Sequence, residues 1–367
     1  MLFLLSIITL FAILNTSAQN VGIGTGTPNA SGLLHLDLGS NVTKGLLVTG
    51  NFSYFNSTLP DLGVGSRMMF YPGKAAFRVG YVEGTEWNNS NVGLKSIAMG
   101  YGTIAFGEYS TALGFKSTAS GSVSTVMGAS NVASGNYSTA MGYNSTASGD
   151  FSIAIGYSAT ANAVQSIALG TDVSTNGKTG SMILGDGGDG YPAHVFTSEA
   201  DNQLFSRFKG GYKFYTSGWG TVLGVVLAPG GNAWSSFSDE RMKENFETLD
   251  SEEVLKKLSA VKYTSWNYKR QDPKTYRHYG IMAQDFFNAF GKDRYGIIGN
   301  DTMVNPIDMM GIAYSAIQAL EKRTQAFKEE NLELKNEVSL LNSRLEKLEK
   351  LCNNISVSSS LKTINNQ

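Results

Sequence analysis

The sequence contains one cysteine, three histidines and seven prolines in 367 residues. The single cysteine, Cys352, excludes a disulfide framework and any metal site built from several thiolates. The histidines His35, His194 and His278 lie far apart, which gives no support to a histidine-rich metal centre. We therefore expect neither a metal ion nor another cofactor.

Charged residues are also scarce: they make up 16% of the chain, where about 25% is usual, and the formal net charge is −1. No basic excess is available to neutralise phosphates, which excludes nucleic-acid binding driven by bulk charge. The apolar share of 42% and the low net charge exclude a mostly disordered chain. Glycine is abundant, at 42 residues, but shows no Gly-X-Y period, so the chain is not a collagen.

The N-terminus has the pattern of a secretory signal. Residues 2–14 are apolar except for Ser6 and Thr9, and the small residues Thr16 and Ala18 occupy the −3 and −1 positions of a cleavage site. The apolar run is shorter than the roughly 20 residues of a membrane span. This predicts a signal peptide at 1–18 and a secreted or cell-surface protein; a buried N-terminal helix or strand is the alternative. No later run of 18 apolar residues exists, so we expect no membrane span.

The middle of the chain is built from an internal repeat. A five-residue phrase, Ser followed by Ile or Thr, a small apolar residue, Met, Leu or Ile, and Gly, returns every 14 residues. Its copies begin at Ser96, Ser110, Ser124, Ser138, Ser152 and Ser166, with a weaker copy at Ser181. Fourteen residues are too few for a helix pair but fit two strands of about five residues with two short turns. The repeat therefore predicts a stack of β-coils.

Small and medium apolar residues alternate within each repeat, which predicts a thin core. One coil cannot bury such a core alone, so stacking of coils and association of chains are both expected. Between residues 96 and 170 the only charged residues are Glu108, Lys116 and Asp150. The paired carboxylates of a glycosidase are absent, which argues against an enzyme that acts on glycans in trans. A passive stalk or binding surface is the better interpretation.

These repeats, over about residues 91–187, resemble the head repeats of trimeric autotransporter adhesins. The resemblance implies a parallel β-roll in each of three chains, and therefore a homotrimer. A β-rich fibre segment is expected before it, at 19–90, and a β-rich connector after it, at 188–233. A surface or glycan ligand of the β-structured body is left open by the sequence.

After residues 228–232 the composition changes, because charged residues and helix formers become frequent. The pattern predicts a short helix at 251–257 and an aromatic-rich strand at 261–268. Asn305 and Pro306 form a good helix start, with an N-cap residue followed by proline at the first helical position. We expect an α+β domain at 234–305.

A heptad pattern follows this helix start. Position a is taken by Ile317, Thr324, Asn331, Val338, Leu345 and Cys352, and position d by Leu320, Phe327, Leu334, Leu341 and Leu348. The alternating spacing of three and four residues predicts a coiled-coil trimerisation helix at 306–352, followed by a disordered tail at 353–367. A single amphipathic helix within a globular domain is the alternative. Heptad rules leave two and three strands open, and the adhesin resemblance favours three.

Two motifs carry candidate chemistry: Ser-Asp-x-Arg-x-Lys at 238–243 and His-x-Gly-x-x-Ala-Gln at 278–284. Taken alone, Ser238 is an N-cap residue for a helix that begins at Asp239. A serine nucleophile needs a base, and lysine can serve as one only if burial or a nearby cation favours its neutral form. A spacing of five places Ser238 and Lys243 on neither one helix face nor one strand face, so a dyad needs a bend or a contact across chains.

This region resembles the C-terminal intramolecular chaperone of phage tailspikes, the endosialidase-type self-cleaving serine peptidase. The resemblance implies that the domain trimerises, guides folding of the β-structured body, and then cuts itself off between Phe237 and Ser238. Ser238 and Lys243 match the catalytic dyad. Three further residues are expected to support the dyad: Arg241, His278 and Gln284. The neutral form of Lys243 would be favoured by the nearby cation Arg241 and by the apolar side chains Phe237, Met242 and Phe246. The alternative is a structural or binding trimer that retains this domain as a clamp.

Overall fold

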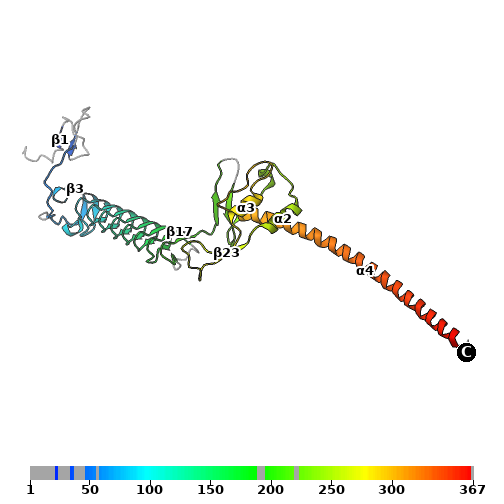
Figure 1. Cartoon of the computed structure of the whole chain (residues 1–367). Coiled ribbons are helices and arrows are strands. Elements are labelled where there is room, and N and C mark those ends of the chain that lie inside the picture. Colours follow the sequence, from blue (N-terminus) through cyan, green and yellow to red (C-terminus); the bar gives the residue numbers. More distant parts are fainter. Residues whose placement is uncertain are drawn as a thin grey trace, which may run out of the picture. The chain divides into compact units, whose positions relative to one another are not determined.

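The computed structural model describes residues 21–23, 34–36, 46–54, 58–187, 195–218 and 223–364 (Figure 1). The predicted signal peptide at 1–18 lies outside the described residues. The chain divides into two compact units, Met1–Phe237 and Ser238–Gln367. The division falls on the peptide bond at which cleavage was predicted.

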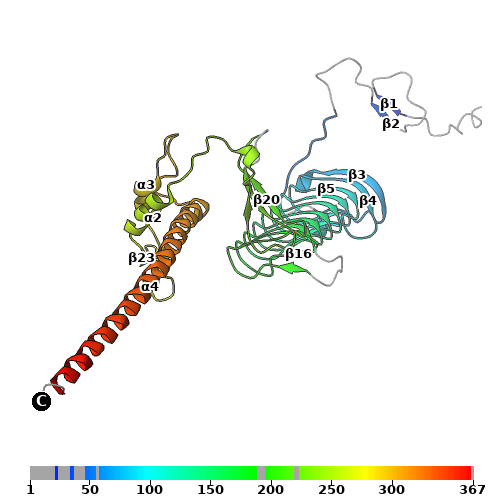
Figure 2. The same cartoon turned by 90° about the vertical axis from the view of Figure 1, so that its right-hand side faces the viewer.

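In the first unit, each repeat forms one coil of a β-roll, with a long and a short strand (Figure 2). The long strands are β5 (Ile97–Tyr101), β7 (Thr111–Phe115), β9 (Thr125–Ala129), β11 (Thr139–Tyr143), β13 (Ile153–Tyr157), β15 (Ile167–Thr171) and β17 (Met182–Asp186). The short strands are β6 (Ile104–Ala105), β8 (Thr118–Ala119), β10 (Val132–Ala133), β12 (Thr146–Ala147), β14 (Thr160–Ala161) and β16 (Val173–Ser174). Successive long strands pair in parallel, with equivalent repeat positions side by side.

The second strand of each coil has two residues rather than the expected five or so, so that part of the prediction was wrong. A coil of 14 residues must turn twice, and the residues after each short strand form the second turn. In that turn a non-glycine residue adopts the left-handed conformation, as Val123 does with φ of 59°. The turn therefore takes positions that the prediction had given to the strand.

The core of the roll is an alanine ladder, as thin as the sequence predicted. Ala98, Ala112, Ala140 and their equivalents point inward and have no exposed surface. The phrase-opening serines are also buried, and several satisfy their hydroxyls locally: Ser110 Oγ, for example, donates to the Gly107 carbonyl oxygen at 2.6 Å. Side chains this small give one coil little apolar area to bury, so the stack is the stable unit.

The sheets extend beyond the predicted boundaries at 91 and 187. The additional strands are β3 (Gly65–Tyr71) and β4 (Ala76–Val82) at one end, and β18 (Phe196–Thr197) and β19 (Leu204–Arg207) at the other. Strand β4 is a cryptic repeat in register with β5, with Gly80 beside Gly100, but Arg78 takes the inward position of alanine. The Arg78 guanidinium is fully buried and donates to the carbonyl oxygens of Ser96 (2.8 Å) and Ala105 (3.0 Å); burial lowers its pKa to about 10.

The remaining elements of the first unit are short. They are a parallel pair, β1 (Val21–Ile23) with β2 (Leu34–Leu36), two 3-10 turns, η1 (Pro72–Lys74) and η2 (Asn89–Asn91), and an antiparallel sheet of β20 (Tyr212–Tyr215), β21 (Gly224–Leu227) and β22 (Ser235–Ser236). Strand β21 lies between β20 and β22. This sheet is the last structure before the end of the unit.

The second unit is an α+β domain with a long final helix. Its elements are η3 (Glu240–Met242), α2 (Ser251–Ala260), β23 (Thr264–Trp266), β24 (His278–Gly280), α3 (Ala283–Phe290) and α4 (Pro306–Ile364). The core joins Val254 of α2 and Phe286 and Phe290 of α3 to Ala316 of α4. Helix α2 is also tied to α4 by an ion pair, Arg323 with Glu252 at 2.6 Å. The start of α4 is therefore part of the domain and not an appendage.

Helix α4 starts at Pro306, as predicted, but it continues past Cys352 to Ile364. The prediction of a disordered tail from residue 353 is therefore corrected for 353–364. That segment contains neither glycine nor proline, so nothing in it ends a helix that has already formed. The fold class, a mostly β body followed by an α+β domain with a long terminal helix, is confirmed.

Candidate functional site

Ser238 and Lys243 lie at the start of the second unit and are brought together within one chain. The 3-10 turn η3 stands between them, closed by hydrogen bonds from Met242 N to Asp239 O (3.1 Å) and from Lys243 N to Glu240 O (3.0 Å). The turn places Lys243 Nζ 2.6 Å from Ser238 Oγ. Of the two arrangements that the spacing of five allowed, a bend or a contact across chains, this is the bend.

Asp239 fixes the turn. Its carboxylate accepts a hydrogen bond from the backbone N–H of Arg241 (2.9 Å) and pairs with the Arg241 guanidinium (2.5 Å). The guanidinium lowers the pKa of Asp239, and the carboxylate in turn raises the pKa of Arg241. The cation that was expected to act on Lys243 is thus already neutralised by a partner of its own.

Neither member of the dyad is buried in the single chain. Ser238 and Lys243 are exposed, and so are Phe237 and Phe246, with 39% and 61% of their surfaces accessible; Met242 is half-buried. The apolar cover expected from these neighbours is therefore absent from one chain. The single chain therefore brings Lys243 Nζ and Ser238 Oγ into hydrogen-bond contact without burying either side chain.

The structure does not bring the other two motif residues to the dyad: among the described residues, no hydrogen bond or ion pair links His278 or Gln284 to Ser238 or Lys243. Gln284 is exposed in the first turn of α3. His278 lies on β24, opposite Trp266 on β23.

Sequence reasoning missed the aromatic surroundings of His278. Its ring lies 4.7 Å from that of Trp266, at 29°, and 5.6 Å from that of Tyr268. His278 Nε2 and Trp266 Nε1 are both buried without a hydrogen-bond partner in the single chain. The pairing of β23 with β24 could have indicated the Trp266 contact, but only once the register of these two short strands was known.

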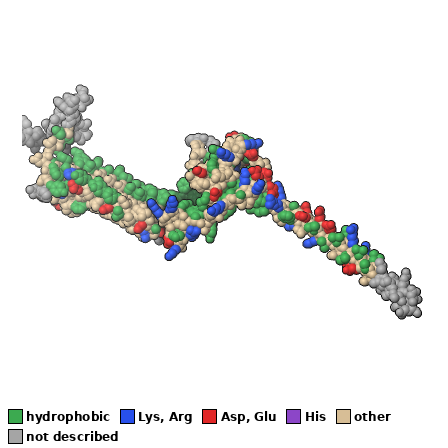
Figure 3. All heavy atoms as spheres, in the orientation of Figure 1, with side chains coloured by type: hydrophobic (Ala, Val, Ile, Leu, Met, Phe, Trp, Pro, Cys, Tyr) green, Lys and Arg blue, Asp and Glu red, His purple; other side chains and the backbone are tan. Residues whose placement is uncertain are grey.

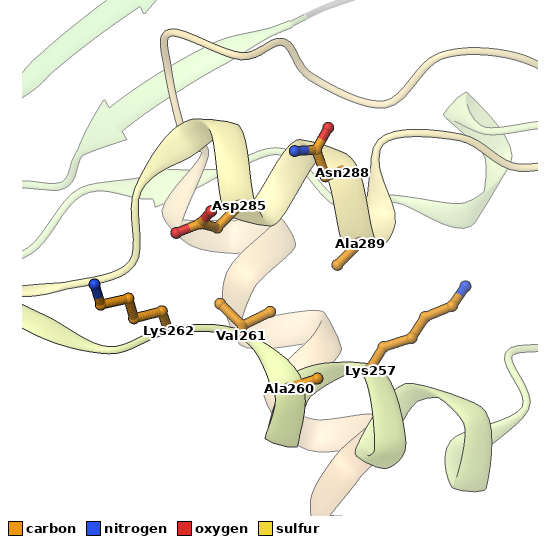
Figure 4. Close-up of a pocket in the computed structure, with 7 residues that line it drawn as sticks. All are labelled: Lys257, Ala260, Val261, Lys262, Asp285, Asn288 and Ala289. Atoms are coloured by element: carbon orange, nitrogen blue, oxygen red, sulfur yellow. The ribbon is translucent and has the colours of Figure 1, made fainter.

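A separate cavity of about 340 Å³ lies between the end of α2 and α3 (Figure 4). It is lined by Lys257, Ala260, Val261, Lys262, Asp285, Asn288 and Ala289. Neither Ser238 nor Lys243 contributes to its walls, so it is not the site of the dyad.

The roll presents a second candidate surface. The outward positions of its long strands carry apolar columns, including Ile97, Met99, Met127 and Ile155, each at least 38% exposed, and Figure 3 shows hydrophobic side chains along the roll. Helix α4 likewise leaves its heptad positions uncovered; Leu334 and Leu341, for example, are more than half exposed. Apolar surfaces this extensive on a single chain are typical of interfaces with other chains.

Within the described ranges, no group of three or more His, Cys, Asp or Glu side chains is arranged to hold a metal ion. No helix in the part of the chain that the structure describes is long and apolar enough to cross a membrane.

Comparison with protein families confirms both resemblances. Residues 238–293 match the family described as chaperone of endosialidase, and the match begins at Ser238. Residues 92–117, 119–145 and 147–172 match the YadA head domain repeat. No curated protein matches the chain. The chain therefore combines adhesin-type head repeats with an endosialidase-type chaperone domain.

Proposed function

We propose that this chain is an exported, homotrimeric, adhesin-like surface protein. In this proposal, the C-terminal chaperone domain drives trimer folding and then releases itself by cutting the chain between Phe237 and Ser238. The observation that carries the proposal is the 2.6 Å contact between Lys243 Nζ and Ser238 Oγ at the boundary of the two compact units. A cut there separates two units that each have their own core.

The chemistry follows from the position of the serine. Lys243, as a neutral amine, takes the hydroxyl proton while Ser238 Oγ attacks the carbonyl carbon of Phe237, which closes a five-membered ring through the Ser238 backbone. The bond from that carbon to the Ser238 nitrogen then breaks, and the nitrogen receives the proton from Lys243. An ester and a free amine result. Water hydrolyses the ester, leaving a carboxylate on Phe237 and the restored hydroxyl on Ser238.

Trimer assembly is the step that we propose switches this reaction on. Burial away from water favours the neutral form of a lysine, and both Ser238 and Lys243 are exposed in the single chain. The apolar seam of α4 and the apolar columns of the roll provide the surfaces for three chains to associate as a parallel coiled coil and a parallel head. Burial of Lys243 in the assembly would then couple cutting to correct folding.

The second candidate is a trimer that keeps its C-terminal domain as a clamp. The exposure of Ser238 and Lys243 in the single chain favours it, because without further burial the dyad would stay inactive.

Denaturing gels of freshly produced protein separate the two functions. Self-cleavage predicts two fragments from the wild type, and one full-length band from Ser238→Ala and from Lys243→Ala. Glu240→Ala, an exposed neighbour in the same turn, is the matched control and should be cut. A full-length wild-type band in a purified trimer would support the clamp and contradict self-cleavage.

A further inference from the structure

The strand that leads to the proposed cleavage site is part of a small sheet. Strand β22 ends at Ser236, one residue before Phe237, and it pairs with β21 through Val225 beside Ser236. On the other side of β21, Gly224 pairs with Tyr215 of β20. Phe237, the next residue after Ser236, is therefore in line with the pair formed by Gly224 and Tyr215.

Phe237 packs on Tyr215 across that row. The two rings are 6.1 Å apart at centroid and inclined by 26°. The residue between them, Gly224, has no side chain, so the rings can meet over the central strand. A Cβ on Gly224 would lie 2.0 Å from the Phe214 carbonyl oxygen, so this position accepts only glycine without a shift of the backbone.

Aromatic side chains also contact this strand on the opposite face of the sheet. Successive residues of a strand point to opposite faces, so Trp234 and Phe237 project from different sides. The Trp234 ring lies 5.5 Å from that of Phe214 and 6.4 Å from that of Tyr212. The short β22 segment is thus fixed by aromatic contacts on both faces, although it has only two residues in the ladder.

We propose that Tyr215 is a positioning residue for self-cleavage: by packing on Phe237 it holds the carbonyl carbon that Ser238 attacks. This inference rests on the proposed function. Cleavage would then require a folded β20–β22 sheet, because before the sheet forms Phe237 and its carbonyl are free to rotate. Release of the chaperone domain would therefore occur only after the sheet at the end of the body has folded.

The test measures how fast full-length protein is converted into the two fragments after synthesis in a cell-free system. We expect Tyr215→Ala to slow cleavage about tenfold or more, since small displacements of reacting groups have effects of this size. Tyr215→Phe, which keeps the ring, should restore the wild-type rate. Lys213→Ala, an exposed position on the same strand, is the control and should also be cut at the wild-type rate. Equal rates for Tyr215→Ala and the wild type would overturn the inference.

A double-mutant cycle separates positioning from general stability. If Tyr215 acts through Phe237, the double variant Tyr215→Ala with Phe237→Ala should be no slower than the slower single variant. Additive slowing would overturn the inference. Tyr215→Leu, which keeps apolar bulk without the ring, covers the case in which Tyr215→Ala does not fold, and should still be slow in a trimer of normal size. An uncut wild type contradicts the proposed function and this inference together; a cut wild type with rapid Tyr215→Ala cleavage contradicts the inference alone.

Discussion

The glycine that ends each repeat phrase provides the sharpest test of the roll. Gly128 has φ of 112°, a conformation that residues with a side chain rarely adopt. An added Cβ would lie 2.1 Å from the carbonyl oxygen of Gly142 in the next coil and 3.0 Å from Asn131 Nδ2. Gly128→Ala must therefore both strain the backbone and push two paired strands apart.

The size of the effect follows from these two costs. Backbone strain at such a position is about 1–3 kcal/mol. Separating β9 from β11 weakens roughly two ladder hydrogen bonds, each contributing about 1 kcal/mol. The free energy of unfolding should fall by about 3–5 kcal/mol per chain, and Tm by about 6–20 °C at roughly 2–4 °C per kcal/mol. Because each coil contacts only its neighbours, the loss arises at one interface of the stack.

The assay is a thermal melt of the full chain followed by circular dichroism, with Ser238→Ala in every sample so that the chain stays intact. Gly177→Ala is the matched control, since Gly177 also has a positive φ, 71°, but a Cβ there would meet no atom within 4 Å. That control should lose only about 1–2 kcal/mol. Equal shifts of Tm for the two variants would refute the argument that coil-to-coil contact requires glycine.

Three further predictions address the strained turns, the dyad turn and the coiled coil. Val123→Asn should raise the free energy of unfolding by about 1 kcal/mol in the same melt, because asparagine adopts the left-handed conformation of this position with less strain than the β-branched valine. An unchanged or lower Tm would count against this. Arg241 lowers the pKa of Asp239 from 3.8, so the pair stabilises its turn above pH 3.8, and this stabilisation is lost as pH falls through the lower folded value. An NMR titration should show that lowered midpoint, and Arg241→Ala should raise it. Cys352, at an a position, should be joined to its counterpart by a short bis-maleimide, with covalent dimers on denaturing gels; monomers alone would contradict a parallel seam.

The roll is well predicted from the sequence because the repeat has a constant period. A 14-residue step repeated from Ser96 to Ser166 leaves one way to stack the coils, with like residues side by side. Helix α4 was equally predictable in its start, since Asn305 and Pro306 mark it independently of tertiary contacts.

The limits of the roll could not be predicted from the same pattern. Strand β4 occupies a coil position although Arg78 replaces the inward alanine. Arg78 fits because its guanidinium donates to the carbonyl oxygens of Ser96 and Ala105 and to the Ser96 hydroxyl, which the repeat pattern does not indicate. The helix over 353–364 was not predicted because the serines and asparagines of this segment have modest helix propensity. An existing helix nevertheless continues through such residues when no glycine or proline ends it.

The candidate site was predictable in its residues and not in its surroundings. The spacing of Ser238 and Lys243 required a bend, and η3 provides it. The ion pair between Arg241 and Asp239 and the stacking of His278 on Trp266 depend on side-chain geometry, which the spacing of residues in the sequence does not indicate. The Tyr215 contact depends on the register of a three-stranded sheet, which sequence alone left open.

The proposed function requires that the chain cuts itself at one bond. Mass spectrometry of intact, freshly assembled protein tests it most directly. Self-cleavage predicts two species: a body that ends at Phe237 and a domain that begins with a free amine on Ser238. A single uncut species, or fragments that meet at any other bond, would contradict it.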